Sequence, residues 1–75
     1  MEYYAVDVMD SGGNLLIHRE FTNRSDSQIY ADILTEIISC AESCKAKELN
    51  SVCPSVLRFR EIKSKYFIIE KVFKK

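Results

Sequence analysis

The stretch "KYFIIEKVFKK", residues 65–75, decides how this fold has to be completed. Successive side chains of an extended strand point to opposite faces of a sheet. One face of this strand carries Tyr66, Ile68 and Val72, and the other carries Phe67, Ile69 and Phe73. A strand with one face in water alternates apolar and polar residues instead. The stretch therefore predicts a strand whose two apolar faces both need a cover.

Length and composition indicate one small folded domain over residues 1–75. The chain has 75 residues, 47% of them hydrophobic and 29% charged, with two glycines and one proline. This composition is that of a globular protein and argues against disorder. Domains of this size bury only about 60% of the surface of the unfolded chain. Such a marginal core is commonly completed by a disulfide, a metal or a second subunit.

The first 21 residues predict a β-hairpin. Residues 3–9 alternate in polarity with Tyr4, Val6 and Val8 on the apolar face, and residues 15–21 alternate again. The intervening "DSGGN" tolerates the positive φ angles of a tight turn. The two apolar faces match when Val8 pairs with Leu15 or with Ile17.

An amphipathic helix is expected from Asp26 to Lys47. Ser25 is a candidate N-cap, and Gln28 can complete a capping box with it. Apolar residues then recur at helical spacing, and we expect them to face the sheet. This predicted inner row consists of Ile29, Ile33, Ile37, Ala41 and Cys44, and it is widened by Tyr30, Leu34, Ile38 and Cys40.

Two more strands follow the helix. In residues 56–60 the alternation predicts that Leu57 and Phe59 point inward and that Arg58 and Arg60 point outward. Residues 61–64 are short enough for a hairpin connection to the final strand. The element order predicts an α+β fold, a four-stranded antiparallel sheet (ββαββ) with one long helix packed on one face. The order of the strands in space stays open.

This arrangement resembles the opening part of longin-like and profilin-like regulatory domains. In that resemblance "AVDVMDSGGNLLIHREF" and "LRFREIKSKYFIIEK" are the two hairpins around the helix. It implies a regulatory module whose second sheet face lacks the later helices of those domains. It assigns no functional residue.

We expect neither a metal nor another cofactor. Cys40, Cys44, Cys53 and His18 could form a three-thiolate, one-imidazole zinc site. The spacing of Cys40 and Cys44 in an amphipathic helix is more typical of two small core thiols. His18 with Asp7 or Glu20 could act as a general base. No nucleophile, phosphate loop or carboxylate pair accompanies it in the sequence, so we predict that the protein is not an enzyme.

A nucleic-acid-binding function is the alternative prediction. Residues 1–54 carry a net charge of −5, whereas residues 55–75 carry +5. The candidate phosphate contacts of the basic C-terminal hairpin are Arg58, Arg60, Lys63, Lys65 and Lys71. The pI near 6.6 and the absence of an RNP-type aromatic strand both argue against this alternative.

The favoured prediction is a protein-interaction or regulatory module, a homodimer or the binder of another protein. One helix covers only one face of the sheet, and large exposed apolar patches mark interaction sites. Either the apolar face or an edge strand could make the contact. The predicted interface consists of Tyr3, Ala5, Met9, Phe67, Ile69 and Phe73. The sequence shows no secretory signal and no apolar run that could span a membrane, so we expect a cytoplasmic protein without a membrane partner.

Overall fold

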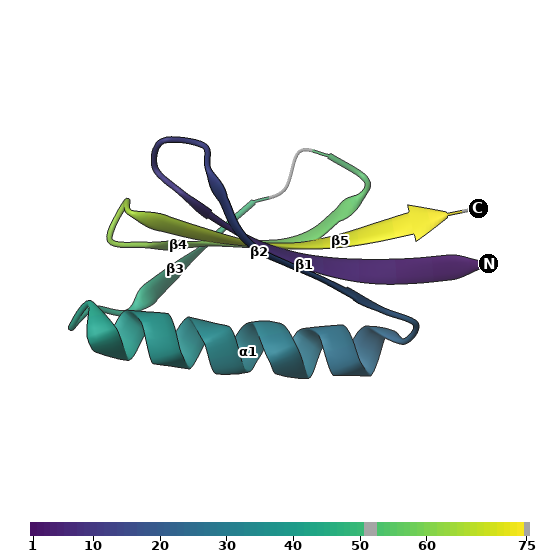
Figure 1. The fold of residues 1–75 in the computed structure, drawn as a ribbon, viewed down its shortest axis with the longest axis horizontal. Coiled ribbons are helices and arrows are strands. Elements are labelled where there is room, and N and C mark those ends of the chain that lie inside the picture. The colour runs from purple at the N-terminus through teal and green to yellow at the C-terminus, as the bar shows by residue number, and fades with distance from the viewer. Residues whose placement is uncertain (51–52, 75) are drawn as a thin grey trace.

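The computed structural model describes residues 1–50 and 53–74 and arranges them as a five-stranded antiparallel sheet with one helix across one face (Figure 1). The predicted α+β class is confirmed. The elements in chain order are β1 (Glu2–Asp10), β2 (Leu15–Phe21), α1 (Arg24–Ala41), β3 (Ala46–Leu49), β4 (Val56–Ile62) and β5 (Tyr66–Lys74).

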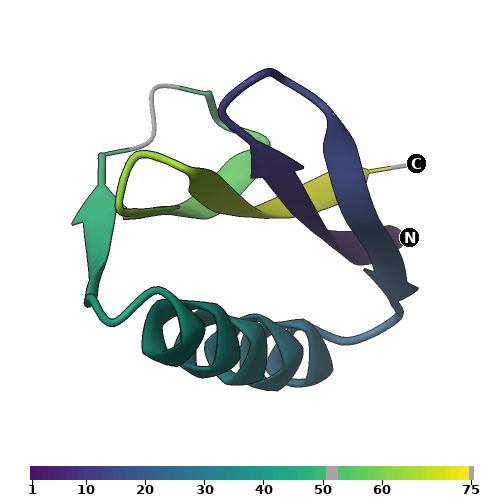
Figure 2. The same cartoon turned by 60° about the vertical axis from the view of Figure 1, so that its left-hand side comes forward.

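The strands lie in the order β2-β1-β5-β4-β3. The first and last described strands are therefore neighbours in the middle of the sheet. They pair over nine positions, from Glu2 with Lys74 to Asp10 with Tyr66. Both views place the start of β1 beside the end of β5 (Figures 1 and 2).

The predicted first hairpin is confirmed. Val8 pairs with Ile17, the second of the two predicted registers. In the turn, the Asp10 carboxylate accepts hydrogen bonds from the backbone N–H groups of Gly12 and Asn14, both at 2.9 Å. Gly13 takes a φ of 83°, which favours glycine. This local network fixes the conformation of the turn.

The helix begins two residues before the predicted Asp26. Its N-cap is Asn23, not the predicted Ser25, and the Asn23 side chain accepts a 3.0 Å hydrogen bond from the backbone N–H of Asp26. Asn23 has an extended backbone with a φ of −133°, as an N-cap requires. Ser25 instead lies inside the first turn of α1.

The sheet has one strand more than the four predicted, because the helix stops at Ala41 and not at Lys47. Ser43 takes a φ of 55°, which breaks the helix and reverses the chain. Residues 46–49 then pair with β4 as the edge strand β3, from Ala46 with Ile62 to Leu49 with Phe59. The sequence "AKEL" favours helix locally, and tertiary pairing overrides that preference.

The predicted inner side of the helix is correct in part. Tyr30, Leu34, Ile38 and Cys44 pack against the core, whereas the isoleucines of the predicted row do not. Ile29, Ile33 and Ile37 are 57%, 51% and 60% exposed. The residues at the centre of the buried side are Ser27 and Ala31. These small side chains allow the helix backbone to approach the sheet closely, and the larger Leu34 and Ile38 pack beside them.

The core lies between α1 and the sheet. Its fully buried side chains come from β1, β4, β5 and α1: Val6, Val8, Ile62, Ile68 and Ala31. Figure 2 shows the helix beneath the sheet, with β2 and β3 at opposite edges. The opposite face of the sheet is called the open face below, because none of the elements in residues 1–50 and 53–74 packs on it.

Arg58 and Arg60 face the helix, which corrects the predicted outward direction. Arg60 pairs with Ile68 and shares its side of the sheet with the buried Ile62. Phe59, predicted to point inward, belongs to the open face with its partner Ile69. Leu57 lies at an irregularity between Val56 and Arg58. The arginines point inward because α1 provides polar partners there.

Among the described residues, no helix combines the length and the apolar character needed to cross a membrane.

Candidate functional site

The six predicted interface residues all belong to the open face, on the two central strands. The register pairs Tyr3 with Phe73 and Met9 with Phe67. Ala5 and Ile69 have the same parity along their strands and so share this face. The last strand, predicted to be apolar on both sides, thus lies next to the first strand, whose Tyr3, Ala5 and Met9 extend the same face.

Aromatic side chains pack against one another across this face. The rings of Tyr3 and Phe73 stack with their centroids 4.8 Å apart and their planes at 16°. Phe59 and Phe67 pack with centroids 5.7 Å apart. All four side chains are half-buried within a single chain. The apolar surface therefore extends over three neighbouring strands, β1, β5 and β4.

An apolar hollow of about 340 Å³ lies beside this surface. It is lined by Leu49, Asn50, Cys53, Val56, Phe59, Ile69 and Lys71. The Cys53 sulfur lies 3.0 Å from the Ser55 hydroxyl oxygen. This contact with Ser55 lowers the pKa of the Cys53 thiol. The open face thus has a hollow here, and most of the residues that line it were not part of the predicted interface.

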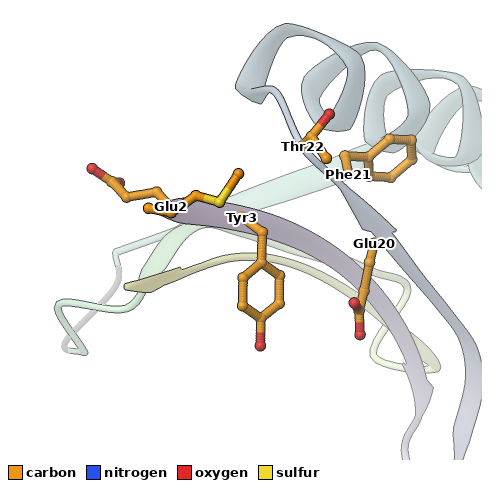
Figure 3. Close-up of a pocket in the computed structure, with 6 residues that line it drawn as sticks. Glu2, Tyr3, Glu20, Phe21 and Thr22 are labelled. Carbon is orange, nitrogen blue, oxygen red and sulfur yellow. The ribbon is translucent and has the colours of Figure 1, made fainter. Parts of the chain in front are cut away.

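A second hollow of about 300 Å³ lies where β1 begins and β2 ends. Figure 3 shows Tyr3 and Glu20 pointing from adjacent strands to the side away from the helix. Phe21 lies on the helix side in the same view. Tyr3 and Glu20 therefore form one border of the open face, where an aromatic ring adjoins a carboxylate.

Four charged side chains cross the open face in a row, called the charge row below. It runs from Glu20 and His18 on β2 through Asp7 on β1 to Lys71 on β5. The His18 Nε2 atom lies 3.1 Å from a Glu20 carboxylate oxygen, and the His18 Nδ1 atom contacts Asp7. The Lys71 ammonium lies 2.9 Å from the other Asp7 oxygen. Each charge in the row has an opposite neighbour.

The row alters the acidity of its members. Burial alone would raise the pKa of Asp7, but hydrogen bonds from Lys71 and His18 outweigh it and hold that pKa below its usual value. Hydrogen bonds to Glu20 and Asp7 raise the pKa of His18 above its usual value of about 6.5. The row thus favours ionised Asp7 and protonated His18.

A second charged cluster lies between the helix and the sheet. Asp32 of α1 accepts hydrogen bonds from Arg58 at 3.1 Å and from Arg60 at 2.7 Å. Glu70 is 2% exposed and forms an ion pair with Arg58. Burial raises the pKa of Glu70, and the opposing attraction of Arg58 does not cancel it. This cluster holds α1 on the sheet and presents no open site.

The five basic residues of the nucleic-acid alternative do not gather on one surface. The side chains of Arg58 and Arg60 are 23% and 12% exposed and bind Asp32 beneath the helix. Lys65 lies in the β4–β5 connection, 3.5 Å from Glu42, and Lys63 occupies the same turn. Lys71 belongs to the charge row on the open face.

The zinc site considered from the sequence is not formed, because the residues that would supply its sulfur and imidazole ligands lie apart. Cys40 lies on the exposed side of α1, whereas His18 lies on the open face. Among the described residues, no three His, Cys, Asp or Glu side chains are placed to hold a metal ion. His18 does lie beside Asp7 and Glu20, the two carboxylates that were considered from the sequence as its partners. The position of Lys71 next to Asp7 was not predicted from the sequence.

Comparison with known proteins finds uncharacterized protein 70 of Sulfolobus islandicus filamentous virus (isolate Iceland/Hveragerdi), which is 34% identical to this chain over 80 residues. The match covers 96% of this chain and 99% of the viral protein. This chain belongs to the family of that viral protein. No family model and no solved structure matches the sequence. The name of the viral protein describes no activity.

Proposed function

We propose that the protein is a non-catalytic interaction module that associates with a second copy of itself through the open face. The observation that carries this proposal is the group of apolar side chains on β1, β5 and β4, where paired aromatic rings lie outside the core on either side of the charge row. Contiguous apolar patches of more than a few hundred Å² on soluble proteins mark interaction sites. Two-fold packing is the commonest way for such a patch to be covered.

The size of the open face supports a dimer. Five strands spaced about 4.8 Å apart give a width of about 24 Å, and the nine-residue strands β1 and β5 give a length of about 30 Å, hence about 700 Å² at most. Stable interfaces bury about 600 to 1,000 Å² on each partner, so the face reaches this range when nearly all of it is covered. Two such faces can pack as the two sheets of a β-sandwich, about 10 Å apart.

The pairing of charges on this face also supports a second copy as the occupant. A charge buried without a partner opposes association, whereas a charge already paired in its own chain needs nothing from the partner. Asp7, the most buried member of the charge row, already contacts Lys71 and His18. A partner therefore needs to supply mainly apolar area, and an identical face supplies it.

The test replaces Phe67 and Ile69 together by glutamine and measures solution mass by light scattering over a concentration series. We expect the parent chain to be a dimer and the Phe67→Gln/Ile69→Gln variant to be a monomer, because polar side chains at the centre of the face resist burial. Met9→Gln, at the border of the same face, is expected to weaken the dimer by about tenfold, as loss of about 1.4 kcal/mol predicts.

The matched control is Ile33→Gln, which removes an equally large exposed apolar side chain from the outer side of α1. It should leave the dimer unchanged. Circular dichroism of each variant shows whether the fold is retained. A parent chain that is monomeric at every concentration would contradict the proposal, as would a folded double variant that still dimerises with the parent affinity.

A further inference from the structure

We propose that association through the open face is linked to proton uptake at His18, so that two copies close on each other when His18 is protonated and separate when it is neutral. This inference rests on the proposed function. It concerns the charge row rather than the apolar surface. Its members cross the face from the edge strand β2 to the central strand β5, so a partner that covers the face also covers the row.

The sum of charges in the row depends on His18. Asp7 and Glu20 contribute two negative charges, and Lys71 contributes one positive charge. With a proton on both ring nitrogens, His18 brings the row to zero net charge and donates to a carboxylate on each side, Asp7 and Glu20. With His18 neutral, one ring nitrogen has no proton to donate, and the row carries a net charge of −1.

Burial of the face amplifies this difference. A charge without a counter-charge is costly to remove from water, whereas a balanced set of hydrogen-bonded charges is less so. A two-fold dimer buries two copies of the row, and two net negative rows also repel each other. Both effects favour protonated His18 in the dimer over the monomer.

Three charged groups on neighbouring positions of the open face surround His18: Asp7 from β1, Glu20 from β2 and, beyond Asp7, Lys71 from β5. Hydrogen bonds from Lys71 and His18 hold the pKa of Asp7 below its usual value. Cys53 lines the hollow beside Lys71 and has a lowered pKa. The Cys53 thiol is therefore the group that has to be separated experimentally from His18.

The sign of the pH dependence follows from linkage. The state that binds more protons gains stability as the pH falls. The dimer is that state, so the dissociation constant should decrease from about pH 8.5 to about pH 6 by at least about tenfold. The limit is about a hundredfold per pH unit, because each dimer takes up at most two protons at the two His18 side chains.

The decisive variant is Glu20→Gln, for which the sign reverses. Without the Glu20 charge the row is balanced when His18 is neutral and carries +1 when His18 is protonated. This variant should therefore dimerise more tightly at about pH 8.5 than at about pH 6. In His18→Gln the net charge of the row stays at −1 at every pH in this range. Dimerisation should therefore be weak, and its dissociation constant should not change with pH.

The experiment measures the dissociation constant by analytical ultracentrifugation across this pH range for the parent, Glu20→Gln and His18→Gln. Glu36→Gln, which removes an exposed carboxylate from the outer side of α1, is the matched control and should behave as the parent. Cys53→Ser removes the thiol titration, and the pH dependence assigned to His18 should persist in it.

The possible outcomes separate this inference from the proposed function. Tightening toward low pH in the parent together with the reversal in Glu20→Gln supports proton linkage. A dimer of constant affinity over the pH range overturns the linkage and leaves the open-face dimer standing. A dependence that disappears in Cys53→Ser also overturns it, because the thiol is then the titrating group. A monomer throughout overturns both.

Discussion

At the scale of single residues, Glu70 and Arg58 form the most consequential pair in the core. Glu70 is nearly fully buried, and its ion partner Arg58 also reaches Asp32 on the helix. Removal of one member of a buried ion pair leaves the other charge without compensation. We expect Arg58→Leu to lower the free energy of unfolding by about 3 to 5 kcal/mol, measured by urea denaturation near neutral pH.

The double variant Arg58→Leu/Glu70→Leu tests whether the loss of stability comes from the uncompensated charge of Glu70. It removes both charges and should recover most of the loss, because well-packed apolar residues can replace a buried ion pair at little cost. The deficit of Arg58→Leu alone should also shrink toward about pH 4, where Glu70 binds a proton more readily. A double variant as unstable as the single one would show that the loss comes from packing instead.

The side of the sheet on which Arg58 and Arg60 lie could not be predicted from the sequence, for a physical reason. Alternation in β4 separates Leu57 and Phe59 from Arg58 and Arg60, and the usual rule assigns the apolar set to the core. Here both sheet faces carry apolar groups, so polarity no longer identifies the inner face. The partners that decide the matter, Asp32 and Glu70, lie on other elements and are far away in sequence.

At the scale of elements, the start of α1 depends on Asn23. Its side chain satisfies the backbone N–H of Asp26, one of the donors that a first helical turn leaves without a partner. We expect Asn23→Ala to lower the free energy of unfolding by about 1 kcal/mol, whereas Asn23→Asp should retain most of it. Ser25→Ala, at the residue predicted to be the cap, should stay within about 0.5 kcal/mol of the parent. Thermal denaturation of the three variants decides between the two caps.

The sequence predicted the elements with strong local signals and missed those fixed by distant contacts. The first hairpin has its own network of turn hydrogen bonds around Asp10. The helix has apolar residues that recur at helical spacing over several turns. Strand β3 has four residues and no such signal, because its partner Ile62 comes much later in the chain. The row of Ile29, Ile33 and Ile37 was expected at the centre of the buried side, but small Ser27 and Ala31 lie there instead.

At the scale of the whole molecule, the sequence predicted the composition of the open face but not its architecture. Parity within β1 and β5 suffices to group Tyr3 with Ala5 and Phe67 with Ile69. The adjacency of the two strands, which makes these groups one surface, depends on strand order, and alternation carries no information about that order. The charge row has the same origin, since Lys71 meets Asp7 across β1 and β5.

The adjacency of β1 and β5 predicts that a circular permutant will fold. Glu2 pairs with Lys74, so a short glycine-serine linker can join the chain ends. With new ends opened in the turn between Asp10 and Asn14, the permutant should keep its circular dichroism spectrum and stay within about 2 kcal/mol of the parent stability. A permutant opened between Ala5 and Val6 interrupts a central strand and should be unfolded. Loss of structure in both would contradict the argument.

The same pairing has a consequence for synthesis on the ribosome. β1 is made first, yet the neighbour that completes the middle of the sheet is made last. Until residues 66–74 have left the exit tunnel, the nascent chain can form the β1–β2 hairpin and the helix but cannot enclose Val6 and Val8. The middle of the sheet is therefore expected to close only after β5 has emerged, and the apolar side chains of β1 are exposed to chaperones until then.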